Sequence, residues 1–256
     1  MPAGLDGNSH PVVSAFRTRV LKTMADRVGA CRGKRVLVGI DGRSGVGKST
    51  FADELAGMLE ARDVATVRST TDLFHRPLSE RMRLGPTSPT GYYRDSHQLD
   101  VIVDELLTPF REGSGRVLVG AFDEPSNQPD RHTATVPERA VLVFDGLFLR
   151  RPELRSFWDL SVLLVADRRC DAAWLDYLGS DLPADASEHA AEVDRRLERA
   201  RWPRYRTGWR TYVESVQDQP TDIEIDNEDF AAPSIRGGSP SPTGPVAKQH
   251  DPPRNL

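Results

Sequence analysis

The sequence predicts an α/β fold in which a parallel five-stranded sheet carries helices on both faces. Short apolar runs, typical of buried parallel strands, alternate with segments in which apolar residues recur at the three- to four-residue spacing of helices. A glycine-rich segment at residues 42–47 joins the strand 35–40 to the helix that follows it. Polar residues follow several of the apolar runs. They would lie at the carboxyl edge of the sheet, where parallel sheets bind ligands.

The expected elements follow from these patterns in chain order. The strands are short apolar runs, and they cover residues 35–40, 64–69, 140–144, 160–165 and 222–226. The helices each have one apolar face, and they cover residues 12–29, the part of 42–61 after the glycines, 99–110, 168–179 and 187–201. Residues 116–136 predict a small β-excursion, and residues 70–91, which hold three prolines and two glycines, predict mostly loop.

Length and composition predict one domain with loose ends. A chain of 256 residues is long enough for a single α/β domain. We expect a flexible N-terminus at residues 1–10, a domain over 11–232 and a lid within it at about 168–206. Residues 233–256 are rich in proline, glycine and serine and poor in apolar residues, which predicts a disordered tail.

Charge and cysteine usage exclude several classes of partner and compartment. The formal net charge of −4 provides no general attraction to nucleic acids or anionic membranes, so neither is an expected partner. The two cysteines, Cys31 and Cys170, lie too far apart in sequence for a zinc motif and suggest free thiols. The chain lacks an apolar run of about 18 residues and a basic start with an apolar core, so we expect a cytoplasmic protein.

Residues 42–49 read GRSGVGKS and match the pattern G-x-x-x-x-G-K-[ST]. Loops of this pattern turn successive backbone N–H groups inward and bind phosphates at the start of a helix. Lys48 would reach the β- and γ-phosphates, and the Ser49 hydroxyl would bind Mg²⁺. The sequence therefore predicts a P-loop NTPase fold with ATP and Mg²⁺ as cofactors. The expected nucleotide-binding residues are Gly42, Ser44, Gly45, Val46, Gly47, Lys48, Ser49 and Thr50.

Two aspartates follow strands at the same edge of the sheet. Asp145 ends the strand 140–144 and would hold Mg²⁺ directly or through water; the alternative is an ordinary turn aspartate before Gly146. Asp72 follows the strand 64–69 and would accept the proton that an alcohol loses as it takes up a phosphoryl group; the alternative is a capping aspartate. Asp72 and Lys48 are the expected catalytic residues.

Several segments together resemble the uridine kinase-like proteins, and more distantly phosphoribulokinase and bacterial pantothenate kinase. The resemblance runs from about residue 33 to 228, and it rests on Gly39–Gly42 leading into the phosphate loop, Thr71–Arg76, Gly91–Ser96 and Phe144–Gly146. It implies a fold with an arginine-bearing lid and transfer of the ATP γ-phosphate to the 5′-hydroxyl of a uridine- or cytidine-like nucleoside. It also allows a homo-oligomer.

The resemblance implies roles for further residues. Asp72 matches the catalytic base of the family, and Asp95 matches the carboxylate that binds the two ribose hydroxyls. Tyr93 lies in the segment that contacts the nucleoside, with simple packing as the alternative. Phe122 lies where the family reads the pyrimidine and could stack on a base. In the lid, Arg195 and Arg199 would bind phosphate, with a solvated helix face as the alternative.

The chain departs from the family where the acceptor is read. The strand end carries Asp145-Gly146 in place of the usual Glu-Gly, and residues 121–127 contain no histidine, so Asn127 and His132 are the polar candidates there. The lid lacks most of the family's arginines. Other acceptors stay open: a modified nucleoside, a nucleoside antibiotic or a pantothenate-like metabolite. A nucleotide-driven switch or an assembly factor is a different class, although the chain has no guanine-reading Asn-Lys-x-Asp motif.

Overall fold

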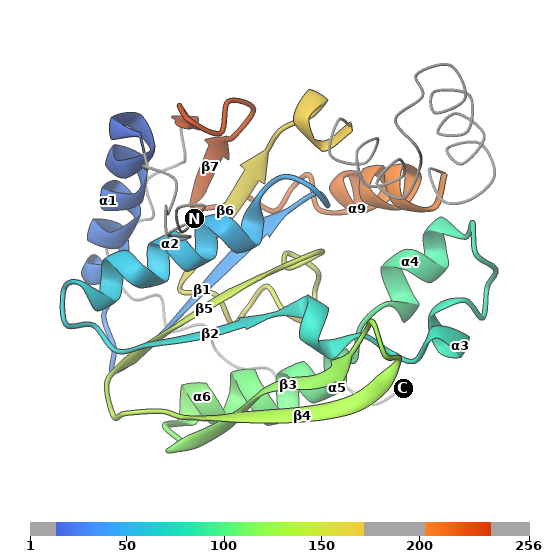
Figure 1. The fold of residues 1–256 in the computed structure, drawn as a ribbon, viewed down its shortest axis with the longest axis horizontal. Helices are drawn as coiled ribbons and strands as arrows, with labels where there is room; N and C mark the ends of the chain where they lie inside the picture. The colour runs from blue at the N-terminus through green and yellow to red at the C-terminus, as the bar shows by residue number, and fades with distance from the viewer. Residues whose placement is uncertain (1–13, 172–202, 237–256) are drawn as a thin grey trace, which may run out of the picture.

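The computed structural model describes residues 14–171 and 203–236. A central sheet has the strand order β2-β5-β1-β6-β7-β8, and a separate two-stranded sheet pairs β3 with β4 (Figure 1). The central strands are β1 (Arg35–Gly42), β2 (Thr66–Thr70), β5 (Ala140–Gly146), β6 (Leu160–Val165), β7 (Ile223–Asp226) and β8 (Ser234–Arg236). The hairpin strands are β3 (Arg116–Asp123) and β4 (Gln128–Thr135).

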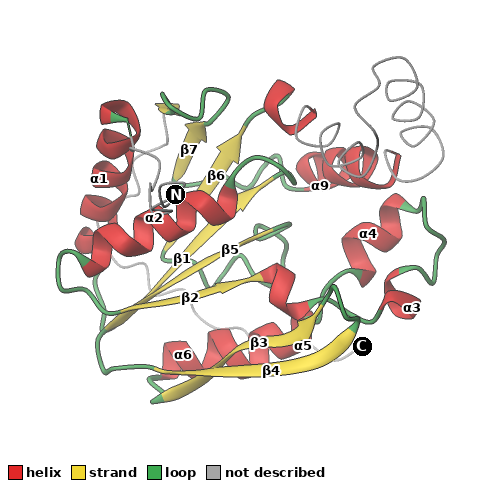
Figure 2. Ribbon diagram, viewed as in Figure 1, coloured by secondary structure: helices red, strands yellow, loops and turns green. Residues whose placement is uncertain are grey.

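Helices precede β1 and occupy the connections from β1 to β2, from β2 to β3 and from β6 to β7 (Figure 2). The helices that flank the sheet are α1 (Ala15–Ala30), α2 (Lys48–Glu60) and the continuous run α5 (Leu99–Val101), η2 (Ile102–Leu107, π-helical) and α6 (Thr108–Glu112). Beyond the carboxyl edge lie η1 (Thr71–Phe74, a 3₁₀ turn), α3 (Leu78–Arg81), α4 (Pro89–Asp95), η4 (Pro203–Thr207, π-helical) and α9 (Gly208–Ser215).

Alternation along the strands gives the sheet two apolar faces. On β1, Val36, Val38 and Ile40 pack with α1 and α2, whereas Leu37 packs on the opposite face with α5, η2 and α6. The strand β5 divides in the same way, with Val143 on the first face and Phe144 on the second. Both faces of the strands are buried, as in other parallel sheets covered by helices.

The register of the sheet brings three strand ends together. Ile40 of β1 pairs with Asp145 of β5, and Thr70 of β2 pairs with the same Asp145. The strands β1, β2 and β5 are parallel, so the phosphate loop after β1, the turn η1 after β2 and the end of β5 meet at one edge. The fold therefore assembles the predicted site from segments far apart in sequence.

The fold class is confirmed, and the structure adds detail at three places. Five strands are parallel as expected, but β8 adds an antiparallel sixth strand in residues expected to belong to the tail. Residues 70–91 are not mostly loop, because Pro77 and Pro89 stand at the N-cap or first position of α3 and α4, where proline is tolerated. The helix expected at 168–179 begins at residue 168, but most of it and the helix 187–201 lie outside the described residues.

Within residues 14–171 and 203–236, the structure has no helix with both the length and the apolar character needed to cross a membrane.

Candidate active site

The loop between β1 and α2 has the backbone conformation that its glycines predict. Gly45 and Gly47 have φ angles of +82° and +89°, in the left-handed region that favours glycine. A Cβ atom on Gly47 would lie 3.1 Å from Asn227 Nδ2 and 3.3 Å from Arg169 Nη2, so side chains crowd the loop from outside. The backbone angle favours glycine at residue 47, and a side chain there would also displace Asn227 or Arg169 slightly.

A buried chain of hydrogen bonds holds the loop from behind. Asn227, which directly follows β7, donates from Nδ2 to the Val46 carbonyl oxygen at 2.7 Å. Its Oδ1 accepts from Arg17 Nη1 on α1 at 3.1 Å, and Arg17 Nε donates to Glu54 of α2 at 2.7 Å. Arg17 and Asn227 are almost fully buried. The sequence analysis missed both, although an asparagine placed directly after the last strand is a usable signal for this edge.

A second buried network lies beside the start of the loop. Asp41 accepts hydrogen bonds from Arg150 Nε at 3.3 Å, from its neighbour Gly42 N at 2.9 Å and from the Tyr212 hydroxyl of α9. Burial and then Asp41 raise the pKa of Tyr212 above its usual range, so this hydroxyl stays a donor. The network ties the C-terminal helix α9 to the residue that precedes the loop.

Lys48 is the first residue of α2 and faces an acidic edge. Its Nζ donates to the Arg43 carbonyl oxygen within the loop at 3.1 Å. Burial lowers the pKa of Lys48, whereas the carboxylates of Asp72, Asp145 and Asp41, in that order, oppose the shift. The structure therefore brings Lys48 within electrostatic reach of both predicted site aspartates.

The predicted metal residues Ser49 and Asp145 are in contact. Ser49 Oγ donates to Asp145 Oδ2 at 2.9 Å, and the Asp145 carboxylate is 1% exposed. Arg68 Nη2 donates to the other oxygen, Oδ1, at 2.9 Å. A hydroxyl beside a carboxylate oxygen is a hard donor set that suits Mg²⁺, and Oδ2 is the oxygen that faces the loop. Arg68 was not predicted; its position in a strand that ends beside Asp145 is the signal that sequence reasoning overlooked.

Asp72 lies on the 3₁₀ turn η1 directly after β2. The Thr70 side chain caps this turn by accepting from Asp72 N at 3.4 Å, so the Asp72 carboxylate is not the N-cap acceptor. Asp72 is exposed and contributes to the electrostatic environment of Lys48. The Asp72 carboxylate is therefore exposed and lies within electrostatic reach of the loop lysine, and its role as a base stays a prediction.

The helix α4 carries two of the predicted substrate-binding residues. The Tyr93 ring is half-buried. Its centroid lies 5.2 Å from the centroid of the Phe148 ring and 4.5 Å from the Arg151 guanidinium, so part of the ring surface is used in packing within the protein. Asp95 Oδ1 lies 3.4 Å from Arg83, whereas its Oδ2 is buried without a hydrogen-bond partner among the described residues. Asp95 thus offers an unused acceptor atom.

The expected base-reading residues are placed differently. Phe122 is 3% exposed, which corrects the expectation of an open stacking platform. Irregular pairing around Gly120 and Phe122 turns consecutive residues of β3 inward, which explains the burial. Asn127 accepts from Leu78 N at 2.8 Å, and the exposed His132 pairs with Asp130 at 2.8 Å. The predicted lid residues Arg195 and Arg199 lie outside the described residues.

Two histidines that the sequence analysis did not single out lie next to Asp72. His75 Nδ1 donates to the Asp72 carbonyl oxygen at 2.9 Å, and the His75 and His97 ring centroids are 4.9 Å apart. Burial lowers the pKa of His75, and burial with nearby cations lowers that of His97 well below its usual range. The spacing Asp-x-x-His at residues 72–75 was the available signal for the first of them.

Curated relatives of this chain include two uridine kinases. The enzyme of Staphylococcus haemolyticus is 26% identical over 135 residues, which cover 51% of this chain and 62% of that protein. The enzyme of Leuconostoc citreum is 24% identical over 140 residues, which cover 52% of this chain and 63% of that protein. The matches thus span less than two thirds of the length of these relatives. No family model matches the chain.

Solved structures extend the likeness to most of the chain. A possible uridine kinase from Bacillus stearothermophilus superposes with a TM-score of 0.63 at 18% identity, covering 81% of this chain and 97% of that one. The D-glycerate 3-kinase of Cryptococcus neoformans superposes with a TM-score of 0.51 at 13% identity, covering 83% and 95%. The chain therefore has the fold of the P-loop kinases and is similar to the uridine kinase-like proteins among them.

Proposed function

We propose that this protein is an ATP-dependent small-molecule kinase that transfers the γ-phosphate to the 5′-hydroxyl of a uridine- or cytidine-like nucleoside. The observation that carries the proposal is the placement of the exposed Asp72 carboxylate opposite Lys48, at the edge where Ser49 contacts Asp145. A nucleotide-driven switch would need the loop, Lys48 and Ser49, but it would not need a carboxylate facing an incoming alcohol.

The phosphate loop would hold the donor. Its N–H groups would bind the β- and γ-phosphates, and Lys48, now bonded to the Arg43 carbonyl oxygen, would turn to neutralise charge on the transferred group. Mg²⁺, bound at Ser49 and Asp145, would supply further neutralisation of the phosphate oxygens. Arg68 holds the Asp145 carboxylate so that Oδ2 faces the loop.

Asp72 would act as the base for the acceptor hydroxyl. As the acceptor oxygen forms its bond to the γ-phosphorus, the bond from that phosphorus to the β–γ bridging oxygen breaks and ADP leaves. The hydroxyl proton passes to the Asp72 carboxylate. Because the transition state is loose, alignment of the acceptor matters as much as the basicity of Asp72.

The unpaired oxygen of Asp95 favours an acceptor molecule that carries two neighbouring hydroxyl groups. Its Oδ2 is buried and lacks a hydrogen-bond partner within the described residues, and vicinal hydroxyls could satisfy such an acceptor atom. Burial is the largest cause that raises the pKa of the neighbouring Tyr92, followed by Tyr205 and then by the Asp72 carboxylate. Tyr92 therefore lies close to Asp72. The proximity of Tyr92 to Asp72 supports α4, the helix that also carries Asp95, as part of the acceptor site.

A second candidate is the same chemistry on another hydroxyl. It is favoured by the burial of Phe122, which removes the expected stacking platform, and by the lack of a histidine at residues 121–127. A modified nucleoside, a nucleoside antibiotic or a pantothenate-like metabolite would then replace uridine or cytidine as the acceptor.

The test is an acceptor screen with the full chain, Mg²⁺ and ATP or GTP, read by the mass of the phosphorylated product. We expect uridine or cytidine to be phosphorylated with ATP as the donor. Product on another alcohol alone would favour the second candidate. ADP formation that needs no acceptor, with no phosphorylated product, would overturn the kinase proposal.

The variant Asp72→Asn distinguishes a role of Asp72 in proton transfer from a role in nucleotide binding. It should keep the affinity for ATP and lose transfer by roughly 10²-fold or more. The matched control is Asp104→Asn, because Asp104 is also exposed but lies in the π-helical segment η2, away from this edge. A full transfer rate in Asp72→Asn would contradict the assignment of the base.

A further inference from the structure

His75 and His97 face each other across a short antiparallel bridge. Arg76 N donates to Ser96 O at 3.0 Å, and Gln98 N donates to Phe74 O at 2.8 Å, so hydrogen bonds flank the histidine pair on both sides. The two histidines therefore form a non-hydrogen-bonded pair, the arrangement in which opposite side chains lie closest. The backbone brings the imidazoles together although 22 residues separate them.

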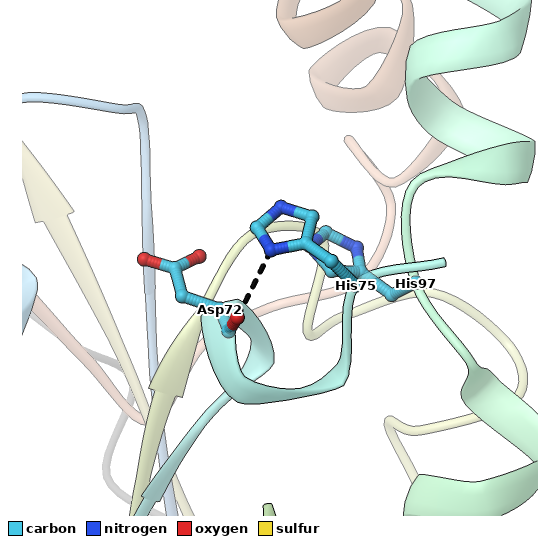
Figure 3. A group of neighbouring side chains, drawn as sticks. All are labelled: Asp72, His75 and His97. Atoms are coloured by element: carbon cyan, nitrogen blue, oxygen red, sulfur yellow. Dashed lines mark hydrogen bonds between the residues drawn. The ribbon is translucent and has the colours of Figure 1, made fainter. Parts of the chain in front are cut away.

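Asp72 joins this pair through the geometry of its own turn. Asp72 lies on the 3₁₀ turn Thr71–Phe74, and His75 directly follows that turn, where its ring bonds back to the Asp72 carbonyl oxygen. One potential ligand atom from each of Asp72, His75 and His97 lies within 4.8 Å of the other two. In Figure 3 the two rings lie side by side, and Asp72 stands on the turn next to His75.

The nitrogen atoms of the pair are available as ligands. His75 Nδ1 donates to the Asp72 carbonyl oxygen at 2.9 Å, which leaves Nε2 as the lone-pair atom of the neutral ring. His97 is 2% exposed, and its Nε2 is buried with no hydrogen-bond partner among the described residues. Leaving such a polar atom unpaired is costly, so a ligand for it would stabilise the site.

Two of the cations near His97, Arg81 and Arg151, are paired with acidic residues. Arg81 Nη1 lies 2.9 Å from Glu124 Oε1, and Arg151 Nη2 lies 2.9 Å from Glu153 Oε1. These ion pairs reduce the repulsion that a bound cation would meet beside the histidines.

We propose that Asp72, His75 and His97 form a binding site for a divalent transition metal of the zinc type, with water completing the coordination. Two imidazoles and one carboxylate suit Zn²⁺, whereas Mg²⁺ prefers oxygen ligands alone. The site is thus distinct in chemistry from the Ser49–Asp145 pair. Asp72 is exposed and His75 is partly exposed, so both side chains have room to rotate towards a bound ion.

Zinc at this site would inhibit phosphoryl transfer, a consequence that rests on the proposed function. A carboxylate oxygen of Asp72 bound to Zn²⁺ would no longer be free to accept the proton of the acceptor hydroxyl. The site would then make the kinase sensitive to free zinc while leaving Mg²⁺-dependent nucleotide binding in place.

The binding test uses the full chain without nucleotide and Zn²⁺ alone as the probe, in competition with a chromophoric zinc chelator. The wild type should bind one equivalent that excess Mg²⁺ does not displace. His75→Gln and His97→Gln should each weaken binding by about tenfold or more. The control His132→Gln, at an exposed histidine paired with Asp130, should bind as the wild type does. His75→Gln keeps the test decisive if the buried His97 variant does not fold.

The inhibition test compares transfer with and without zinc, each variant being normalised to its own zinc-free rate. Zinc should inhibit the wild type and His132→Gln more strongly than His75→Gln. Equal zinc binding by the wild type and His75→Gln would overturn the site, and binding without inhibition would overturn its effect on Asp72. Zinc binding by a protein with no zinc-free transfer would uphold the site and overturn the proposed function. Phosphoryl transfer by a protein that does not bind zinc would overturn the zinc site and uphold the proposed function.

Discussion

Arg68 and Ser49 donate to opposite oxygens of the Asp145 carboxylate, Arg68 Nη2 to Oδ1 and Ser49 Oγ to Oδ2, each at 2.9 Å. Arg68 comes from β2 and Ser49 from α2, so the carboxylate is fixed between two elements. The two contacts hold the carboxylate with Oδ2 towards Ser49, the residue that follows Lys48.

Arg68→Gln should destabilise the protein. The variant removes a charged hydrogen bond to a carboxylate that is 1% exposed, which should lower the free energy of unfolding by about 1–3 kcal/mol. The matched control is Asp53→Asn, which removes the other acidic partner of Arg68; the Asp53 side chain is 69% exposed, so the loss should stay below about 1 kcal/mol. Urea denaturation measures both. Equal losses would mean that the contact with Asp145 contributes nothing special.

Lys48→Ala should abolish most of the catalytic turnover. The lysine would neutralise charge on the transferred phosphoryl group, so its loss should reduce kcat by about 10²-fold or more. The control Lys22→Ala, at an exposed position on α1, should keep the wild-type rate. Steady-state kinetics with the acceptor found in the screen measures the effect, and a rate within twofold of the wild type would refute the role of Lys48.

Asn227→Ala should weaken both stability and nucleotide binding. It removes the donor to the Val46 carbonyl oxygen and the acceptor for Arg17, leaving buried polar atoms without partners at a cost of about 1–3 kcal/mol. The loop would lose the contact that fixes its shape, so the Kd for ATP should rise. Thermal denaturation and equilibrium binding measure the two effects, with the exposed Gln217→Ala as the control. An unchanged Kd would show that the loop does not depend on this brace.

Cys170 should make stability fall at alkaline pH. Burial, as the largest cause, raises the pKa of its thiol to about 11 from its ordinary value of 9.0. The unfolded thiol ionises first, so the folded state binds more protons in this window. Its contribution is complete below pH 9 and is lost as pH rises towards 11, at up to about 1.4 kcal/mol per pH unit. Cys170→Ala should show a shallower decline in the free energy of unfolding over that range; equal slopes would contradict the assignment.

Local patterns were sufficient to predict most of the fold. The loop 42–49 is specified by adjacent glycines and the strands by apolar runs, so β1, α2 and β5 follow from short stretches of sequence. The contact between Ser49 and Asp145 was also predictable, because parallel strands end at a common edge. Segments whose structure depends on capping were harder to predict: proline suggested loop at residue 89, where Ser88 in fact caps α4.

Long-range partners were beyond sequence reasoning. Nothing near His75 indicates His97 as its neighbour, since the two residues meet only through strand pairing. Phe122 was placed wrongly because its orientation depends on irregular pairing in β3, which the alternation of residues does not reveal. The strand β8 contains one apolar residue, Ile235, and is too short to give a period.

The hydrogen bond from Asn227 to the phosphate loop can form only late in the synthesis of the chain. Asn227 lies 181 residues after Val46, so a ribosome releases the complete glycine motif long before the amide that fixes its carbonyl group. A nascent chain, or a fragment that ends before β7, contains the glycine motif but lacks the Asn227 side chain that bonds to it. The phosphate loop therefore gains this hydrogen bond only when almost all of the described chain has been made.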